Sequence, residues 1–477
     1  MTTTSRAAVT AAAAHADAVA RLRASYAAIP AGQPVRLAKR TSNLFRPRTG
    51  EPVAGLDVSG LDGVISIDPG VRTADVAGMC SYESLVEATL PYGLMPMVVP
   101  QLKTITLGGA VTGLGIESTS FRNGLPHESV LEMDILTGDG EIVTASPTEH
   151  SDLFAGFPNS YGSLGYAVRL RIALEPVRPY VALRHVRFSG PSALEELCAA
   201  VAEISTKRSW DGAPVDFLDG VMFSPTEAYL SLARWVDWPA EAGQSAASDY
   251  TGQDIYYRSI QQRETDCLSV HDYIWRWDTD WFWCSGAFGV QNPRIRKLWP
   301  ARYRRSDFYH RLIALDYRFG IAAKIDRIKR IGPRERVVQD VEIPLEQTAD
   351  FLRWFAANVP MAPVWLCPLK LRETDDGGPD SAREWPLYPL TPGRMYVNAG
   401  FWGTVPIGLG DQDGDVNRKI ENAVAARDGH KSLYSDAYYD RDTFNAMYGG
   451  DVYSKLKAKF DPANRLTGMY EKAVGRR

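Results

Sequence analysis

The chain contains 477 residues, of which 45% are hydrophobic and 23% are charged, with 12 Trp and 22 Tyr among them. This composition is typical of a globular protein of two or three domains, and it excludes a disordered chain and a disulfide-stapled miniprotein. Because the formal net charge is −4, the chain has no overall basic footprint for a phosphate backbone, and we expect no nucleic acid among its partners.

The cysteines and the N-terminal residues indicate the cellular compartment in which the protein is expected. Five cysteines are scattered along the chain and none forms a C-x-x-C pair, which favours a reducing cytoplasm. No His or Cys residues have metal-ligand spacing, so we expect no metal. The first 20 residues are Ala-rich but interrupted by Arg6, His15 and Asp17, so they fit neither a signal peptide nor a membrane helix. We therefore expect a cytoplasmic protein whose contact with a membrane would be peripheral, on its inner face.

Short-range patterns predict a first domain that mixes helices and strands. A helix is expected over the first ~20 residues, and Pro30-Ala31-Gly32 ends it. Runs rich in β-formers, divided by Gly and Pro, follow from Val35 to Val143 and predict strands at 63–67, 94–99 and 131–136. Between these strands, Ser81 caps a helix that continues to Leu90 and stops at the following Pro-Tyr-Gly.

A domain boundary is predicted at Pro176 to Pro179, after a strand at 167–174 with strict alternation. The expected units are residues 1–179, residues 180–435 and a C-terminal segment at 436–477. The second unit contains a helix at 193–204 and a strand at 337–343. In the C-terminal segment, apolar residues at helical spacing on both sides of Gly449-Gly450 predict two helices.

The segment from Pro100 to Gly124 carries five glycines and a dense set of hydroxyl side chains. Glycines let backbone amides approach a phosphate closely, and hydroxyls add hydrogen-bond donors, so the segment fits a bound pyrophosphate. Tight turns in a β-rich domain are the other explanation for a bare glycine cluster. The spacing matches neither the Rossmann fingerprint nor a P-loop, which disfavours the common nucleotide-binding folds.

These glycines, followed by SDLF at 151–154 and GSLGYAV at 162–168, resemble the FAD-binding domain of the vanillyl-alcohol-oxidase (PCMH-type) flavoproteins. Within that superfamily, IESTSFRNGL at 116–125 is similar to the flavin loop of the delta-24 sterol reductases. Further matches at 337–340, 365–368 and 434–444 extend the resemblance from about residue 39 to the C-terminus. The implied fold class is α+β, with a two-part PCMH-type FAD-binding domain and an α/β cap domain that covers the isoalloxazine ring and takes the substrate.

The resemblance also implies which residues hold FAD. A first phosphate loop would consist of Lys39, Arg40, Thr41, Ser42 and Asn43. This loop lacks the His of the covalent members, so we expect FAD to be bound non-covalently. The other positions carried over are Thr106, Gly108, Gly109, Gly113, Glu117, Ser118, Ser120, Gly124 and Val168. Residues 459–462 resemble the C-terminal return of the superfamily to its FAD-binding domain.

Two stretches of the expected cap have an unusual composition. Large rings alternate from Tyr273 to Trp283, and they could line an apolar tunnel or form an ordinary core strand. A basic stretch interleaved with aromatic residues fits anionic lipid headgroups, the phosphates of a pyridine nucleotide, or a solvated face, and the sequence leaves all three open. Its basic residues are Arg294, Arg296, Lys297, Arg302, Arg304 and Arg305.

Candidate catalytic acids lie on the strand predicted at 337–343. Alternation puts Asp340 and Glu342 on one face of that strand. In carbohydrate oxidases of the superfamily, an acidic or polar residue near this position faces the flavin, so the resemblance makes these two the candidates, with Lys370 and Tyr396 behind them. A buried ion pair or solvent-facing carboxylates is the alternative for either acid.

The resemblance implies a reductase that passes hydride from NADPH through FAD to an unactivated C=C bond of a lipid. The chain most resembles bacterial reductases that convert a 10-methylene to a 10-methyl (tuberculostearic-type) fatty acyl chain, beside a methyltransferase dependent on S-adenosylmethionine. The expected absence of an N-terminal membrane segment and the Ala- and Arg-rich composition favour this acyl chain over a sterol side chain. An alcohol or sugar oxidase of the same fold, and a catalytically silent lipid carrier that binds flavin, are the alternatives.

Overall fold

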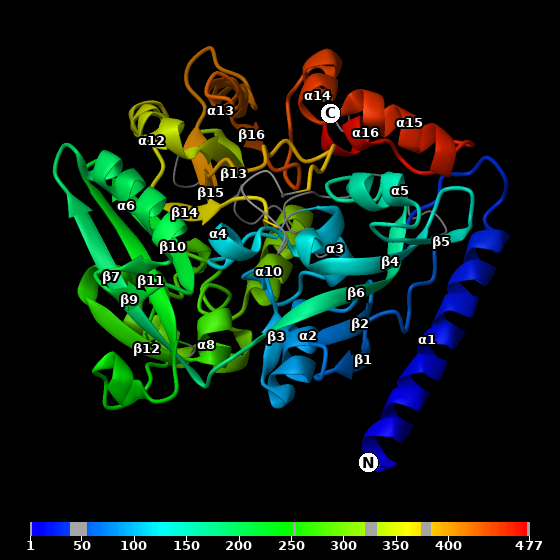
Figure 1. Ribbon diagram of the computed structural model, residues 1–477. Coiled ribbons are helices and arrows are strands. Elements are labelled where there is room, and N and C mark those ends of the chain that lie inside the picture. Colours follow the sequence, from blue (N-terminus) through cyan, green and yellow to red (C-terminus); the bar gives the residue numbers. More distant parts are fainter. Residues whose placement is uncertain are drawn as a thin grey trace.

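The computed structural model describes residues 2–38, 55–113, 115–250, 254–319, 332–373 and 383–474. Two antiparallel sheets lie side by side in this part of the chain, with helices packed around them (Figure 1). The expected α+β fold class is confirmed. The chain passes from the first sheet to the second between Pro176 and Tyr180.

The N-terminal helix α1 (Thr2–Ala28) lies along the edge of the first sheet, where Ala18 and Leu22 share a core with Val168 (Figure 1). The strand order of this six-stranded sheet is β1 (Val64–Asp68), β2 (Thr73–Ala77), β6 (Tyr166–Pro176), β4 (Val130–Leu136) and β5 (Ile142–Ala145), with β3 (Leu94–Pro96) paired to β6. Strand β3 is shorter than predicted because the carbonyl of Met97 turns to accept hydrogen bonds from Thr119 and Asn123.

Short helices connect the strands of the first sheet. Ser81 caps α2 as predicted, because its hydroxyl accepts a hydrogen bond from the amide of Ser84 at 3.2 Å. The helices are α2 (Tyr82–Thr89), η1 (Leu90–Tyr92), α3 (Leu107–Thr112), α4 (Ser120–Asn123), η2 (Pro126–Ser129) and α5 (Ser151–Gly156).

The second sheet has eight strands, in the order β12 (Thr265–Ser269), β7 (Tyr180–Ser189), β11 (Glu227–Val236), β10 (Phe217–Ser224), β14 (Val364–Leu369), β15 (Tyr396–Pro406), β13 (Arg334–Pro344) and β16 (His430–Lys431). A two-stranded ribbon, β8 (Ser209–Trp210) and β9 (Ala213–Pro214), lies beside it. One face packs on α6 (Ala193–Lys207), α12 (Leu345–Asn358) and α13 (Asp415–Ala425).

Alternation along the central strands sorts apolar from polar side chains. Val341 of β13 and Ala399 of β15 join the core beneath the helices, whereas Asp340 and Asn398 point to the opposite face. The register pairs Asp340 with Gly400 and Glu342 with Asn398. The polar face of the second sheet is therefore concentrated on β13 and β15.

An insertion between β11 and β13 covers this polar face. It contains η3 (Pro239–Ala242), α7 (Tyr256–Gln262), α8 (Val270–Ile274), η4 (Cys284–Phe288), α9 (Pro293–Leu298), η5 (Ala301–Tyr303) and α10 (Ser306–Phe319), together with β12. The aromatic run is not a strand: it winds through α8 and tight turns, with Trp281 and Phe282 at φ of 45° and 58°. Its rings are nevertheless buried, because the run folds into the core.

The C-terminal helices α14 (Arg441–Met447), α15 (Gly450–Phe460) and α16 (Met469–Ala473) return over the first sheet (Figure 1). Lys457 donates to the carbonyl of Ser163 at 2.9 Å, and Lys472 donates to that of Gly162 at 2.8 Å. The division that the sequence predicts at Gly449-Gly450 is confirmed.

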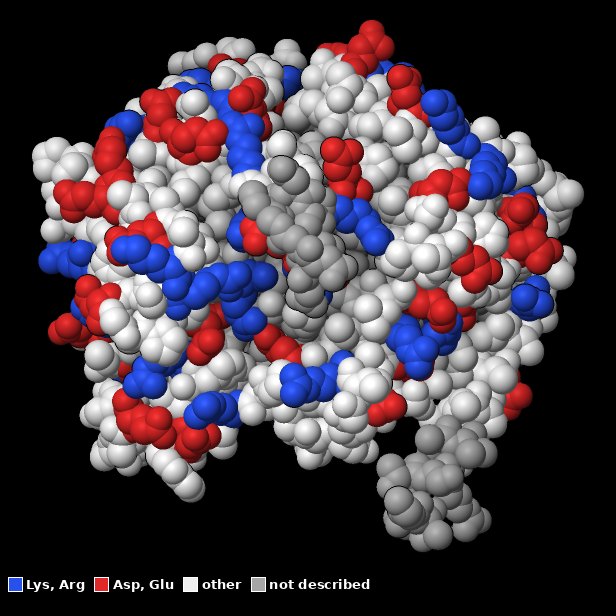
Figure 2. Space-filling model, viewed as in Figure 1, with Lys and Arg blue, Asp and Glu red and all other residues white. Residues whose placement is uncertain are grey.

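Charged side chains of both signs are interspersed over the face of the molecule in Figure 2, in keeping with the small net charge. No helix among the described residues is both long enough and apolar enough to cross a membrane.

Candidate active site

A buried cluster of polar side chains surrounds Asp340 on the polar face of the second sheet. Asn398 Nδ2 donates to Asp340 Oδ1 at 2.7 Å, and the Tyr434 hydroxyl donates to Oδ2 at 2.7 Å. Trp402 Nε1 in turn donates to the Tyr434 hydroxyl at 2.9 Å. These three donors fix the orientation of one carboxyl group, which is the arrangement that an acid or base needs in order to act in a defined direction.

Burial sets the protonation of this carboxyl group. Loss of hydration raises the pKa of Asp340 to about 6, although the hydrogen bonds from Asn398 and Tyr434 oppose the shift. A carboxyl group with such a pKa carries a proton in about a tenth of molecules at pH 7 and in about half at pH 6. Asp340 is therefore suited to proton transfer.

Glu342 lies deeper on the same strand. Its Oε1 accepts a hydrogen bond of 2.5 Å from the Ser432 hydroxyl, and its Oε2 lies 3.3 Å from His430 Nε2. Burial raises the pKa of Glu342 well above its usual value and lowers that of His430 to about 3, so burial disfavours the charged form of both side chains. Asp340 contributes to the raised pKa of Glu342, so the protonation of the two carboxyl groups is coupled.

A glycine opposite Asp340 makes room for the cluster. A Cβ at Gly400 would lie 2.6 Å from Asp340 Oδ1 and 2.6 Å from Trp402 Cη2, whereas a Cβ at Gly403 would lie 3.3 Å from the flexible end of Met361. We expect Gly400→Ala to lower stability by about 1–3 kcal/mol and turnover by at least about tenfold, because the carboxyl group is displaced. Thermal unfolding and activity assays measure both effects. Gly403→Ala is the matched control, and equal behaviour of the two variants would contradict the prediction.

Tyr161, in the loop after α5, connects this cluster with the glycine-rich segment. Its amide donates to the carbonyl of Thr112 at 2.7 Å, and its ring would lie 3.3 Å from a Cβ at Gly113. The hydroxyls of Tyr388 and Tyr434 both interact electrostatically with Tyr161. The polar face of the second sheet therefore meets the first domain at the end of α3.

Several buried polar atoms at this junction have no hydrogen-bond partner among the described residues. They include Asn398 Oδ1, His430 Nδ1 and Ser160 Oγ. Unsatisfied groups of this kind are costly, and a bound molecule with its own donors and acceptors would satisfy them. A flavin ring carries such groups along one edge, so the residues at the junction fit FAD.

The predicted FAD residues divide into four groups. Lys39 to Asn43 lie outside the described residues. Thr106, Gly108, Gly109 and Gly113 form α3 and its two ends, and a Cβ at Gly108 would lie only 2.5 Å from the carbonyl of Gly78. Val168 is buried in β6 and accepts a hydrogen bond from the Gly78 amide.

The remaining predicted FAD residues, Glu117, Ser118, Ser120 and Gly124, surround α4. Glu117 lies 2.8 Å from Arg276 NH2, which lies 2.9 Å from Asp219 of β10. Ser118 hydrogen-bonds the Glu117 carboxylate, and Ser120 accepts from the Glu117 amide. Gly124 has φ of +70° and no space for a side chain beside Glu128. This segment joins the two sheets through a buried ion network.

The other two predicted catalytic residues lie apart from Asp340. Lys370 follows β14, where its ammonium group contacts Glu373 at 2.6 Å. Tyr396 shares the polar face, and its ring packs edge-on against His430, but its hydroxyl bonds Thr391. The structure thus brings Asp340 and Glu342 together, places Tyr396 at the edge of their cluster and leaves Lys370 outside it.

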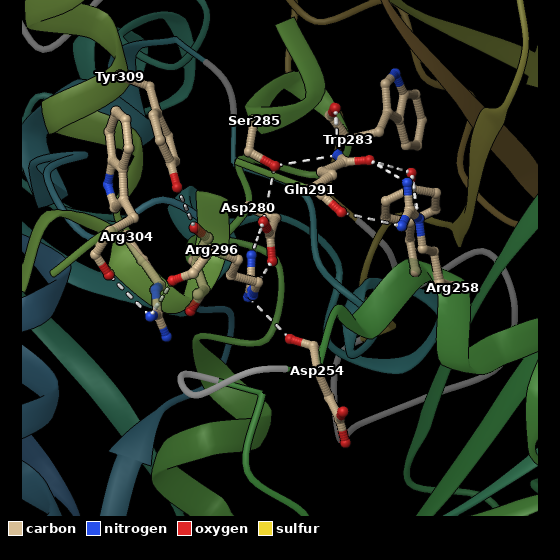
Figure 3. A network of polar contacts seen from close by, with 12 residues as sticks. Asp254, Arg258, Asp280, Trp283, Ser285, Gln291, Arg296, Arg304 and Tyr309 are labelled. Atoms are coloured by element: carbon tan, nitrogen blue, oxygen red, sulfur yellow. Dashed lines mark hydrogen bonds and ion pairs between the residues drawn. The ribbon is translucent and has the colours of Figure 1, made fainter. Parts of the chain in front are cut away.

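The basic stretch is partly internal. The Arg296 guanidinium points inward and pairs with Asp280 at 2.7 Å, and Ser285 and Gln291 continue the network (Figure 3). Arg304 is also buried and donates to the carbonyl of Trp299. Two of the six predicted surface cations therefore stabilise the insertion instead of lining its surface.

Comparison with known proteins agrees with the FAD-binding domain that the sequence predicts. Residues 7–146 match a family model described as an FAD binding domain. The chain carries an FAD-binding domain. In a shorter region it is also similar to cytokinin dehydrogenase 9 of Oryza sativa subsp. japonica, with 35% identity over 111 residues, or 23% of this chain and 21% of that protein.

Other relatives match most of the chain. Delta(24)-sterol reductase of Homo sapiens is 25% identical over 436 residues, which cover 87% of this chain and 75% of the relative. Delta(24)-sterol reductase of Arabidopsis thaliana is 24% identical over 453 residues, covering 88% and 76%. The similarity to these reductases thus extends well beyond residues 7–146, the part that matches the FAD-binding family model.

Sequence reasoning missed most of the groups around Asp340. Asn398 could have been found, because it lies two residues after Tyr396 on the same face of β15. Tyr434 lies within a stretch that carries the family resemblance, yet no role was assigned to it. Trp402, Ser432 and His430 had no distinguishing local pattern. Among the described residues, no group of three His, Cys, Asp or Glu side chains could hold a metal ion.

Proposed function

We propose that this protein is an FAD-dependent reductase of an unactivated C=C bond in a lipid, with NADPH as the electron donor. The proposed substrate is a 10-methylene fatty acyl chain, which would become the 10-methyl chain. The observation that carries the proposal is the Asp340 carboxyl group, which is buried, has a raised pKa and lies beside the junction with the FAD-binding domain. The similarity to reductases over most of the chain supports it.

FAD would lie between α3 and the polar face of the second sheet. The backbone of 106–113 and the loop at 39–43 would hold its phosphates without a covalent bond, and Asn398 would contact its ring. When bound, FAD supplies the hydride for the reduction. An isolated alkene accepts a hydride only if it is protonated beforehand or in the same step.

Asp340 supplies the proton in this proposal. Its acid form transfers a proton to the terminal methylene carbon, and positive charge develops at the branched carbon, which three carbon substituents stabilise. Asn398 and Tyr434 hold the carboxylate that remains, because both already donate to its oxygens. The aromatic walls exclude water that would otherwise capture the cation. Phe282 and Trp283 both pack on Trp402 at this site.

This role predicts a pH dependence with a definite sign. Only the protonated form of Asp340 is active, and that form decreases tenfold per pH unit above its pKa of about 6. We expect kcat/KM to be constant below about pH 6 and to fall as the pH rises beyond it. Steady-state kinetics measure the dependence of kcat/KM on pH between pH 5 and 9, in buffers of constant ionic strength. A kcat/KM that rises with pH over this range would contradict an acid role.

The function is tested with purified protein loaded with FAD. We expect anaerobic NADPH to bleach the flavin absorbance, and a phospholipid with a 10-methylene acyl chain to restore it while the lipid gains two hydrogens. Mass spectrometry measures the product. Bleaching by a primary alcohol or a sugar, with no response to NADPH, would instead support the oxidase. Flavin binding without reduction by either donor would support a lipid carrier.

A sterol with a side-chain double bond is the second candidate substrate, because the relatives that match most of the chain are named for its reduction. Parallel assays with both lipids distinguish the two. A methyltransferase dependent on S-adenosylmethionine would supply the methylene lipid, and we propose a cytoplasmic location at the inner membrane face for the pair.

A further inference from the structure

The insertion exposes apolar side chains next to basic ones. Leu298 at the end of α9 is 85% exposed, Ile295 one turn before it is 41% exposed, and Leu315 of α10 is 48% exposed. Exposed aliphatic residues of this size normally occur singly, so two of them one turn apart on α9, with a third on α10, indicate a surface with a partner.

The cations of the same stretch that face solvent are Arg294, Lys297 and Arg302. None of them forms an ion pair with a residue that the structure describes. We call the six side chains Arg294, Ile295, Lys297, Leu298, Arg302 and Leu315 the α9–α10 surface. It combines solvent-facing positive charge with protruding aliphatic groups, which is the composition of segments that rest in the headgroup region of a bilayer.

The buried cations beneath this surface hold it in place. Arg296 projects inward between Arg294 and Lys297 and binds Asp280, and Arg304 donates to the carbonyls of Arg296 and Trp299 (Figure 3). The exposed residues therefore stand on a fixed framework, so little ordering is required when they meet a partner.

We propose that the α9–α10 surface docks on an anionic phospholipid bilayer. The proposal rests on the proposed function, because it names where the lipid substrate is met. Charge complementarity carries the choice of partner: acidic headgroups attract Lys297 and its neighbours, while Leu298 and Ile295 enter the acyl boundary.

This surface and the aromatic groups beside the candidate active site belong to the same insertion. The ring centre of Trp299, directly after α9, lies 6.4 Å from the ring centre of Tyr309. The Tyr309 ring stacks on Phe288 with a distance of 5.4 Å between the ring centres. In the same insertion, the ring centre of Phe282 lies 4.3 Å from that of Trp402. Trp402 donates the hydrogen bond to the Tyr434 hydroxyl. The insertion thus contains one group of stacked rings beneath the proposed membrane contact and a second group beside the residues that hold Asp340.

Vesicle sedimentation of the FAD-loaded protein, without NADPH, tests the docking. We expect the protein to pellet with phosphatidylcholine vesicles that contain about 30% phosphatidylglycerol, to stay in solution with pure phosphatidylcholine, and to be released by salt. Ile295→Glu/Leu298→Glu is expected to lower the partition coefficient at least about tenfold. Leu409→Glu is the matched control, because Leu409 is fully exposed elsewhere. Bound FAD and circular dichroism verify that each variant is folded.

Equal vesicle binding by wild type and the double variant would overturn the proposal, as would an equal loss in Leu409→Glu. Lys297→Glu/Arg302→Glu separates it from a nucleotide site: a raised KM for NADPH with unchanged vesicle binding would also overturn it. Because sedimentation needs no turnover, binding to anionic vesicles without lipid reduction would contradict the proposed function and leave the docking intact.

Discussion

Asp340→Asn is expected to lower the rate of lipid reduction by about 10²- to 10⁴-fold, the usual contribution of a positioned general acid. Asparagine keeps the size of the side chain and can still bond Asn398 and Tyr434, but it has no proton to transfer. Anaerobic stopped-flow measurement of flavin reoxidation by the lipid gives the rate. Reduction of the flavin by NADPH should remain unchanged, because that step requires no proton from Asp340.

A second readout separates catalysis from structure. If Asp340 is the acid, the residual activity of Asp340→Asn should lose the decline of kcat/KM above about pH 6 that its pKa causes. Asp350→Asn on α12 is the control, since that carboxyl group is exposed and bonds Arg427 at the surface. A variant at position 340 with a rate within a few-fold of wild type would remove Asp340 from the mechanism.

Arg276→Met is expected to destabilise the fold by about 3–5 kcal/mol, because it leaves two buried carboxylates without their counter-ion. Arg276 is fully buried and pairs with Glu117 near α4 and with Asp219 of β10. Its guanidinium also lies 4.0 Å from the centre of the Tyr273 ring. Urea unfolding followed by tryptophan fluorescence measures the loss.

Arg178→Met is the control for that loss, because Arg178 and Asp237 form an ion pair that is half exposed at the surface. We expect it to cost less than about 1 kcal/mol. The triple variant Glu117→Gln/Asp219→Asn/Arg276→Met should recover much of the stability, because no charge is then left buried. A single variant at position 276 that is as stable as the control would show that the network is not required.

Local sequence patterns predicted much of the fold. The cap at Ser81, the alternation at 167–174 and the glycine pair at 449–450 each depend on neighbours within a few residues, and all three elements are present. The expectation of a core strand for the aromatic run at 273–283 was wrong, because aromatic residues pack in a core from turns as well as from strands. Its path is set by partners far away, such as Asp219, which accepts a hydrogen bond from Trp277.

The candidate site was predictable only where one strand defines it. Asp340 and Glu342 share a face because alternation is a local property. Tyr434 reaches Asp340 from 94 residues along the chain, and Asn398 from 58 residues, so neither contact leaves a mark in the sequence around the acid. The pKa of Asp340 likewise depends on its burial, to which distant parts of the chain such as the insertion between β11 and β13 contribute.

The lysines that bind the loop at 162–163 have a consequence for synthesis on the ribosome. Lys457 and Lys472 are separated from their carbonyl partners by 294 and 310 residues. The last strand of the first sheet ends at Pro176, so all of its strands are synthesised long before either lysine. The last strand of the second sheet ends at Lys431, which also precedes both lysines. The first sheet is therefore synthesised first, but its loop at 162–163 is secured last. A nascent chain that stops early would present a complete second sheet beside a loop that lacks these two hydrogen bonds.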